Sequence, residues 1–179
     1  ESLSFNNVVA FNLDEYFPMD SSSIHSYVQF MHQNLFDEID IPKAQIHIPD
    51  GTLPVEKIDA YGVDYEEKIA TLGGIDLQLL GIGRTGHIGF NEKGSSLNSR
   101  TRRVTLARKT IIDAAPSFGG EENVPTHAIT MGVASILEAE RVVLMARGAS
   151  KKEIVHRAIC GEVGPCLLYT SPSPRDSGQ

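Results

Sequence analysis

The chain has 179 residues, of which 41% are hydrophobic and 22% charged, and its formal net charge is −7. This length and composition are ordinary for one globular domain that buries its own core. The negative charge and the scattered Lys and Arg residues exclude non-specific nucleic-acid binding, which needs a concentrated basic surface. No stretch approaches the roughly 20 consecutive apolar residues of a membrane span, so no membrane partner is predicted.

The two cysteines, Cys160 and Cys166, lie too close together for a disulfide framework and form no metal-type CxxC pair. A reducing, cytoplasmic setting is therefore expected.

Both ends of the chain differ from its body. An apolar strand at residues 8–11 begins almost at once, with no preceding helix to cover that face of a sheet. At the other end, residues 166–176 resemble the translation of a sequencing adapter, and two prolines there prevent a regular element. We expect a partial domain at residues 1–165, truncated at both ends, and a disordered, non-native tail at residues 166–179.

The first half of the chain alternates between apolar strands and amphipathic helices. After the strand at 8–11, apolar residues at three- and four-residue spacing predict a helix from the serines at 21–23 to about Glu38. A short strand at 46–48 follows, and then a helix at 55–72 that Gly73-Gly74 ends.

The alternation continues in the second half. Residues 75–83 form a short apolar run closed by glycines, which is typical of a buried central strand that opens into a loop. The later elements are strands at 103–106, 128–131 and 141–145, a helix through Leu137 and a final helix from about Lys151. This order predicts an α/β fold, a Rossmann-like three-layer sandwich with a mostly parallel sheet.

Two carboxylates, Asp14 and Glu15, directly follow the first strand. Catalytic groups of α/β enzymes gather at the carboxyl ends of strands, so either carboxylate could act there as a base. Acids that cap the turn or lie in solvent would give the same pattern, and this pair alone leaves both interpretations open.

A glycine-rich loop follows the predicted central strand. Residues 81–92 read Gly-Ile-Gly-Arg-Thr-Gly-His-Ile-Gly-Phe-Asn-Glu, which places His87 and Glu92 five residues apart. Glycines let a backbone approach a ligand closely, and an imidazole with a pKa of roughly 6.5 exchanges protons near neutrality. The pair suits the opening of a sugar ring. A histidine satisfied by a backbone carbonyl is the alternative.

A dinucleotide or a metal ion fits this loop less well. Gly81, Gly83 and Gly86 have the spacing of a dinucleotide fingerprint, but residues 89–91 interrupt the helix that must follow it. The other histidines are dispersed and form no HxH or HxxxH pair. We therefore predict neither NAD nor a catalytic metal.

Several motifs together resemble the glucosamine-6-phosphate deaminase family, over residues 5 to about 163. They are Asn-Leu-Asp-Glu-Tyr at 12–16, Ser-Tyr-x-x-Phe-Met at 26–31, Gly-His-Ile-Gly-Phe-Asn-Glu at 86–92, Ser-Ser-Leu-x-Ser-Arg-Thr-Arg at 95–102, Val-Pro-x-x-Ala-Ile-Thr-Met-Gly at 124–132 and Gly-x-x-Lys at 148–151. The resemblance implies that glucosamine 6-phosphate and water become fructose 6-phosphate and ammonia, without a cofactor.

The resemblance also implies roles for single residues. Asp14 matches the enolisation base, which moves a proton between C2 and C1 of the opened sugar. His87 matches the ring-opening acid and base, and Glu92 its supporting carboxylate. Lys151 matches a ligand of the substrate phosphate, and Gly86 is assigned to substrate binding. A solvated lysine in the first turn of a helix is the other interpretation of Lys151.

Three features depart from the family pattern. Thr85, which we also count as a candidate catalytic residue, stands where many members carry an Asp or Asn that completes the hydrogen-bonded relay to the histidine. Pro116 replaces a phosphate-binding arginine of some members, and Val104 replaces a lysine that regulated members carry beside Arg102. The family's Gly-Ser/Thr-rich phosphate loop would precede residue 1, so weak binding or inactivity of this chain is expected.

Two other functions stay open. A 6-phosphogluconolactonase-like hydrolase shares the fold and a Gly-His loop but is not expected to carry the Phe-Asn-Glu sequence of residues 90–92. Thr85 and Pro116 are compatible with a non-catalytic, sugar-phosphate-binding regulator, whereas Asp14, His87 and Glu92 argue against one. In each case the predicted partner is a small sugar phosphate, and the full-length protein could form a homo-oligomer.

Overall fold

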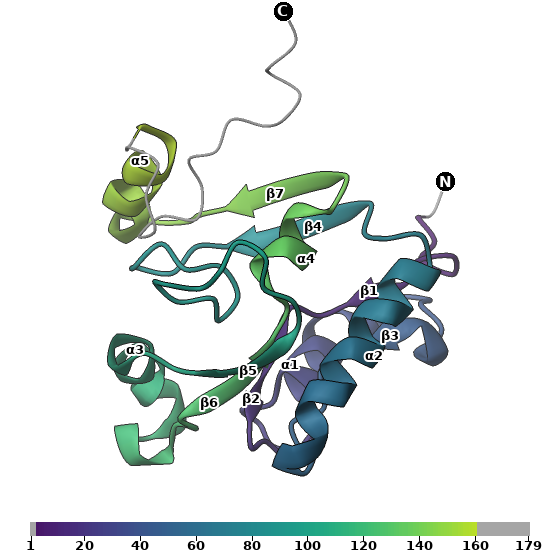
Figure 1. Cartoon of the computed structure of the whole chain (residues 1–179), viewed down its shortest axis with the longest axis horizontal. Coiled ribbons are helices and arrows are strands. Elements are labelled where there is room, and N and C mark those ends of the chain that lie inside the picture. Colours follow the sequence, from purple (N-terminus) through teal and green to yellow (C-terminus); the bar gives the residue numbers. More distant parts are fainter. Residues whose placement is uncertain (1–2, 161–179) are drawn as a thin grey trace, which may run out of the picture.

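The computed structural model describes residues 3–160 and contains two parallel strand pairs and one antiparallel three-stranded sheet (Figure 1). The strands are β1 (Ala10–Phe11), β2 (Asp14–Phe17), β3 (Ile46–His47), β4 (Leu77–Gly81), β5 (Arg102–Thr105), β6 (His127–Thr130) and β7 (Arg141–Met145). The α-helices are α1 (Tyr27–Asn34), α2 (Ile58–Thr71), α3 (Arg108–Phe118), α4 (Val133–Leu137) and α5 (Lys152–Cys160). Single 3-10 turns occupy Phe36–Glu38, Lys43–Gln45, Val55–Lys57, Glu121–Asn123 and Ala149–Lys151.

The parallel pairs form where the sequence predicts apolar strands. β1 pairs with β3 in the register Ala10 to Ile46, and β4 pairs with β7 along all five residues of each strand. Parallel neighbours need a long crossover connection, which the helices between these strands supply. The predicted α/β class is confirmed.

The antiparallel sheet has the order β2-β6-β5 and was not among the expectations. Asp14 lies just beyond β1, as predicted, but it is also the first residue of β2 and pairs with Thr130 of β6. The Met131 backbone N–H donates to the carbonyl of Leu13 at 2.7 Å and extends this contact. The carboxylate of Asp14 is therefore mounted on a strand rather than on a free loop.

Two helices differ from the prediction. Helix α1 begins at Tyr27, because the hydroxyl of Ser26 caps it by accepting from the Val28 N–H at 3.0 Å. Helix α3 was not predicted. Pro116 lies inside it and removes one backbone donor, which argues against a helix on sequence grounds. Gly119, in the left-handed region at φ 72°, ends this helix.

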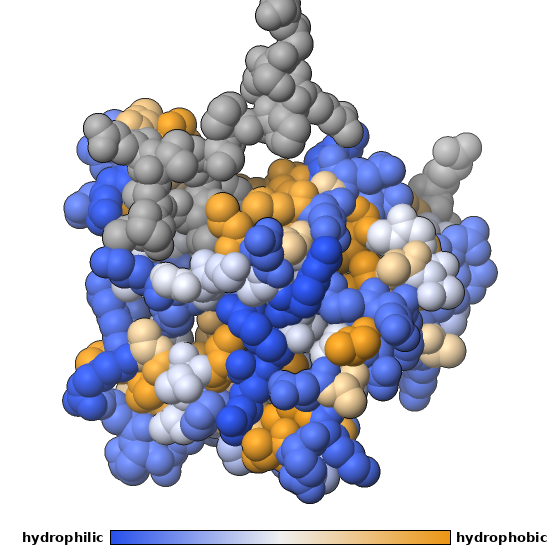
Figure 2. All heavy atoms as spheres, viewed as in Figure 1, coloured by the Kyte–Doolittle hydropathy of each residue, from blue (hydrophilic) through white to orange (hydrophobic). Residues whose placement is uncertain are grey.

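Strand β4 is half exposed, whereas the sequence predicted a strand buried on both faces. Leu80 is only 1% exposed, but Leu77 and Leu79 are 50% and 49% exposed. Successive side chains of a strand point to opposite faces, and only the Leu80 face packs on the core. On β7, Val143 and Met145 are exposed as well, and Figure 2 shows apolar atoms gathered over β7.

Two apolar clusters position the glycine-rich loop after β4. Ile88 is fully buried in a cluster with Tyr65 and Met131. Phe90 packs in a second cluster, where its ring centroid is 5.1 Å from that of Tyr16. Burial of one large apolar side chain contributes roughly 1.5–3 kcal/mol, so these two anchors hold the loop firmly on both sides of Gly89.

Within the described part of the chain, no helix has both the length and the apolar character that crossing a bilayer requires. The expected tail at residues 166–179 lies outside the described residues.

Candidate functional site

The candidate site is built on residues 82–92, the loop that follows β4. In Figure 1 this loop lies between α5 and α3. The Gly83 N–H donates to the carbonyl of His87 at 2.9 Å, and the Gly86 N–H donates to that of Gly83 at 3.0 Å. A β-carbon on residue 83 would overlap the His87 imidazole. Glycine at this position therefore lets the ring lie against the loop backbone.

Two side chains orient the imidazole of His87 through the same ring nitrogen. Its Nδ1 lies 2.8 Å from the Thr85 hydroxyl and 3.3 Å from the Glu92 carboxylate. The other nitrogen, Nε2, makes no hydrogen bond to any residue between 3 and 160. Nε2 is thus the atom that this arrangement leaves for a proton transfer to or from a ligand.

Glu92 is linked to both the loop and α3. Besides His87, it accepts a hydrogen bond from the hydroxyl of Thr110. Burial alone would raise the pKa of Glu92, but the hydrogen bonds from His87 and Thr110 outweigh burial and lower the pKa below its ordinary value. Glu92 therefore stays ionised at neutral pH and faces His87 as a carboxylate.

Asp14 approaches the same loop from β2. A β-carbon on Gly89 would lie 3.2 Å from Asp14 Oδ2 and 2.9 Å from the Thr130 hydroxyl. The loop backbone thus passes directly over the carboxylate. Burial, and secondly the charge of Glu15, raise the pKa of Asp14 from 3.8 to about 7. A carboxylate with such a pKa can both accept and return a proton near neutrality.

Lys151 reaches the loop from the opposite side. It ends the 3-10 turn before α5, and its Nζ donates to the carbonyl of Ile82 at 2.6 Å. This contact does not fit the interpretation of Lys151 as a solvated surface lysine. Gly86 lies within the loop at φ 87°.

All six residues that the sequence singled out are thus in or against this one loop. They are Asp14, Thr85, Gly86, His87, Glu92 and Lys151. Among residues 3–160, no cluster of three or more His, Cys, Asp and Glu side chains could hold a metal ion.

Four supporting residues were missed by sequence reasoning. Thr110 holds Glu92, and the Thr130 hydroxyl accepts from the Phe90 N–H at 3.2 Å. The amide of Asn91 donates to the Met131 carbonyl at 2.8 Å and accepts from Arg102 at 3.0 Å. Asn91, Arg102 and Thr130 lie in motifs named above, and only Thr110 does not. A lone threonine on a distant element carries no spacing signal.

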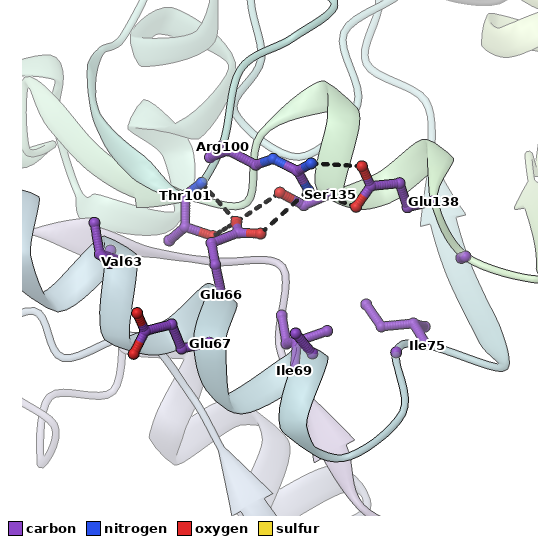
Figure 3. Close-up of a pocket in the computed structure, with 13 residues that line it drawn as sticks. Val63, Glu66, Glu67, Ile69, Ile75, Arg100, Thr101, Ser135 and Glu138 are labelled. Atoms are coloured by element: carbon purple, nitrogen blue, oxygen red, sulfur yellow. Dashed lines mark hydrogen bonds and ion pairs between the residues drawn. The ribbon is translucent and has the colours of Figure 1, made fainter.

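A cavity of about 460 Å³ lies elsewhere, between α2 and α4 (Figure 3). Glu66 of α2 accepts hydrogen bonds from the Thr101 N–H at 2.7 Å and from the Ser135 hydroxyl at 2.5 Å. Arg100 forms a two-pronged pair with Glu138 at 2.5 Å. None of the predicted site residues lines this cavity. These paired polar groups join α2 to α4 and to the start of β5.

Comparison with known proteins agrees with the motifs. A family model described as glucosamine-6-phosphate isomerases/6-phosphogluconolactonase matches residues 1–172. The chain belongs to this family. A glucosamine-6-phosphate deaminase of Colwellia psychrerythraea is 49% identical over 162 residues, which are 89% of this chain and 59% of that protein. The predicted resemblance to deaminases is confirmed.

Two solved structures resemble this chain to different degrees. A monomeric glucosamine-6-phosphate deaminase has a TM-score of 0.89 at 40% identity, over 93% of this chain and 68% of that one. A 6-phosphogluconolactonase from Thermotoga maritima has a TM-score of 0.72 at 21% identity, over 94% of this chain and 70% of that one, and this likeness shows the fold alone. The chain therefore spans about three fifths of the Colwellia protein and about two thirds of either solved chain.

Proposed function

We propose that the complete protein converts glucosamine 6-phosphate and water to fructose 6-phosphate and ammonia, and that this chain carries the acid–base residues of the site. One observation carries the proposal: Asp14 lies against the same loop that contains the His87–Glu92 pair. They do so in a chain whose relatives at 40% and 49% identity are named as deaminases.

Ring opening is assigned to His87. This step moves a proton from the anomeric hydroxyl to the ring oxygen, and a single imidazole can perform both transfers. Nδ1 is oriented by Thr85 and Glu92, so Nε2 faces the sugar in the proposed complex. Because Thr85 is neutral, the charge beside the imidazole nitrogen Nδ1 within residues 3–160 comes from Glu92.

Isomerisation and loss of ammonia are assigned to Asp14. Its carboxylate removes the proton from C2 of the open aldehyde while the aldehyde oxygen takes a proton from the substrate's own ammonium group, which leaves an enolamine between C1 and C2. Return of a proton to C1 converts the enolamine to the C2 imine of fructose 6-phosphate. Water adds to this imine, and the C–N bond breaks to give the ketone and ammonia. A pKa of about 7 suits a group that must both take and give a proton.

Phosphate binding is assigned to Lys151, and Gly86 is assigned to substrate binding. An ammonium group has three donors, and the Ile82 carbonyl uses one of them. Two N–H groups of Lys151 are therefore available to phosphate oxygens. We also propose a cytoplasmic protein whose partner is a small sugar phosphate, not a nucleic acid or a membrane. Light scattering of the complete protein tests whether it forms a homo-oligomer.

Assays of the complete protein with two substrates test the proposal. We expect release of ammonia and fructose 6-phosphate from glucosamine 6-phosphate, and little hydrolysis of 6-phosphogluconolactone. Lactone hydrolysis without ammonia would establish the hydrolase instead. Tight binding of a sugar phosphate with neither reaction would establish the non-catalytic regulator, with which the neutral Thr85 is compatible.

A further inference from the structure

Glu15 is a buried carboxylate beside the proposed base and has no role in the steps above. Its side chain is 1% exposed. Adjacent strand residues point to opposite faces, so Glu15 faces α1, whereas Asp14 faces the loop. Carboxylates are seldom fully buried unless a cation or several hydrogen bonds compensate for the lost water.

Hydrogen bonds provide this compensation. Glu15 accepts from the Ser26 hydroxyl at 2.6 Å and from the N–H groups of Tyr16, Tyr27 and Val28 at 2.9, 3.1 and 3.3 Å. Three of these donors lie at the start of α1, where backbone N–H groups lack helical partners and the helix dipole favours a negative charge. Within residues 3–160, no Lys, Arg or His forms an ion pair with Glu15.

We propose that Glu15 is a positioning residue whose buried negative charge, held by the start of α1, keeps Asp14 basic enough to remove a proton from carbon. This inference rests on the proposed function, in which Asp14 is the base. A hydrogen-bonded carboxylate keeps its full charge, whereas an ion pair would cancel most of it. The charge of Glu15 therefore acts on its neighbour with little attenuation in the low-dielectric interior.

The other groups around Asp14 do not offset this charge. Tyr16 of β2, Tyr27 of α1 and Tyr65 of α2 lie near enough for the Asp14 charge, in addition to burial, to raise the pKa of each, and Thr130 of β6 pairs with the strand that carries Asp14. Burial raises the pKa of each of these tyrosines above its ordinary value, so all three are neutral near pH 7. Burial and then Glu15 account for the raised pKa of Asp14.

Glu15→Gln in the complete protein tests the inference. The amide keeps the shape of the side chain, and its Nε2 can donate to the Ser26 hydroxyl, which already accepts from Val28. Carbon-13 NMR of the Asp14 carboxyl gives its titration midpoint. We expect a midpoint near 7 in the wild type and a lower one in Glu15→Gln, toward the ordinary value of 3.8. An unchanged midpoint in the folded variant overturns the inference.

A matched control is Glu66→Gln, which neutralises another hydrogen-bonded carboxylate that lines the cavity between α2 and α4. It should leave the Asp14 midpoint where it is, and an equal shift in both variants would also overturn the inference. Circular dichroism checks that each variant folds. If Glu15→Gln does not fold, Glu15→Ala, which removes the same charge, gives the same comparison of Asp14 midpoints with the same two outcomes.

Kinetics supply a second readout, because the acidic limb of the kcat/KM profile should move to lower pH in Glu15→Gln. The NMR titration needs no substrate, so it judges the role of Glu15 separately from the reaction. Absence of ammonia release from the wild type would refute the proposed function and leave the titration result standing.

Discussion

Two groups of acidic side chains in this chain are compensated in different ways. Glu66 and Glu138 lie beside Arg100, whose guanidinium pairs with both of them. Asp14 and Glu15 lie beside each other, and neither forms an ion pair with a residue between 3 and 160. The hydrogen bond from Arg100 lowers the pKa of Glu138, whereas burial and Glu15 raise that of Asp14. A paired acid serves to join elements, and an unpaired one gains chemical reactivity.

The largest expected effect is on catalysis by the unpaired acids. Asp14→Asn in the complete protein should lower kcat by roughly 100- to 10,000-fold, the usual contribution of a positioned base, with little change in substrate affinity. Ammonia release measures kcat, and calorimetric titration measures binding. Loss of binding with an unchanged kcat would show instead that Asp14 only holds the sugar.

His87→Gln separates ring opening from isomerisation. We expect a fall of roughly 100-fold with the cyclic substrate and a smaller fall with an open-chain analogue, because the analogue bypasses the ring-opening step. Parallel assays of the two compounds measure the ratio. Equal losses with both would contradict the assignment of His87 to ring opening.

The raised pKa of Asp14 also predicts a pH-dependent stability. The folded-state pKa of about 7 exceeds the ordinary value of 3.8, so the contribution of Asp14 to stability is fully present below 3.8 and is lost as the pH rises through 7. Asn cannot ionise. Between about pH 4 and about pH 8, the unfolding free energy of the wild type should therefore fall by on the order of 3 kcal/mol more than that of Asp14→Asn. Urea unfolding of both proteins at both pH values measures this difference. An equal change of unfolding free energy with pH in the two proteins would contradict the prediction.

A substitution beside the paired acids should affect folding and leave the chemistry unchanged. A β-carbon on Gly132 would overlap the carbonyl of Ser99, so the start of α4 approaches the segment before β5 too closely for any other residue. We expect Gly132→Ala to cost about 1–3 kcal/mol of unfolding free energy, the usual cost of overpacking. Thermal denaturation measures this loss. A wild-type melting temperature would mean that the two segments can move apart freely.

The smallest effect is expected at Glu138. The side chains of Arg100 and Glu138 are 50% and 61% exposed, and exposed ion pairs contribute about 0–1 kcal/mol. Glu138→Gln should change stability by no more than this and leave ammonia release unaltered. A large loss of activity in this variant would show that the cavity between α2 and α4 takes part in the reaction.

Local sequence signals predicted the class of fold and indicated the loop after β4, and the resemblance to the deaminase family supplied the roles expected for single residues. Short apolar runs predicted the strands β1, β3, β4 and β7, and apolar residues at helical spacing predicted α2. These patterns depend on residues that are close in the chain. The loop was predicted from the glycines at 83, 86 and 89, together with His87 between them and Glu92 just after them. The geometry of this loop depends on the backbone freedom of its glycines and on contacts between residues close in the sequence, so a short stretch of sequence is enough to predict it.

The contacts that give these residues their chemistry arise from parts of the chain far apart in sequence. Thr110 reaches Glu92 from α3, and Thr130 lies opposite Asp14 only because β2 and β6 pair antiparallel. The exposed outer face of β4 and the burial of Glu15 under α1 likewise depend on which elements pack together. A raised carboxylate pKa is a property of its surroundings, and spacing along a sequence does not contain those surroundings.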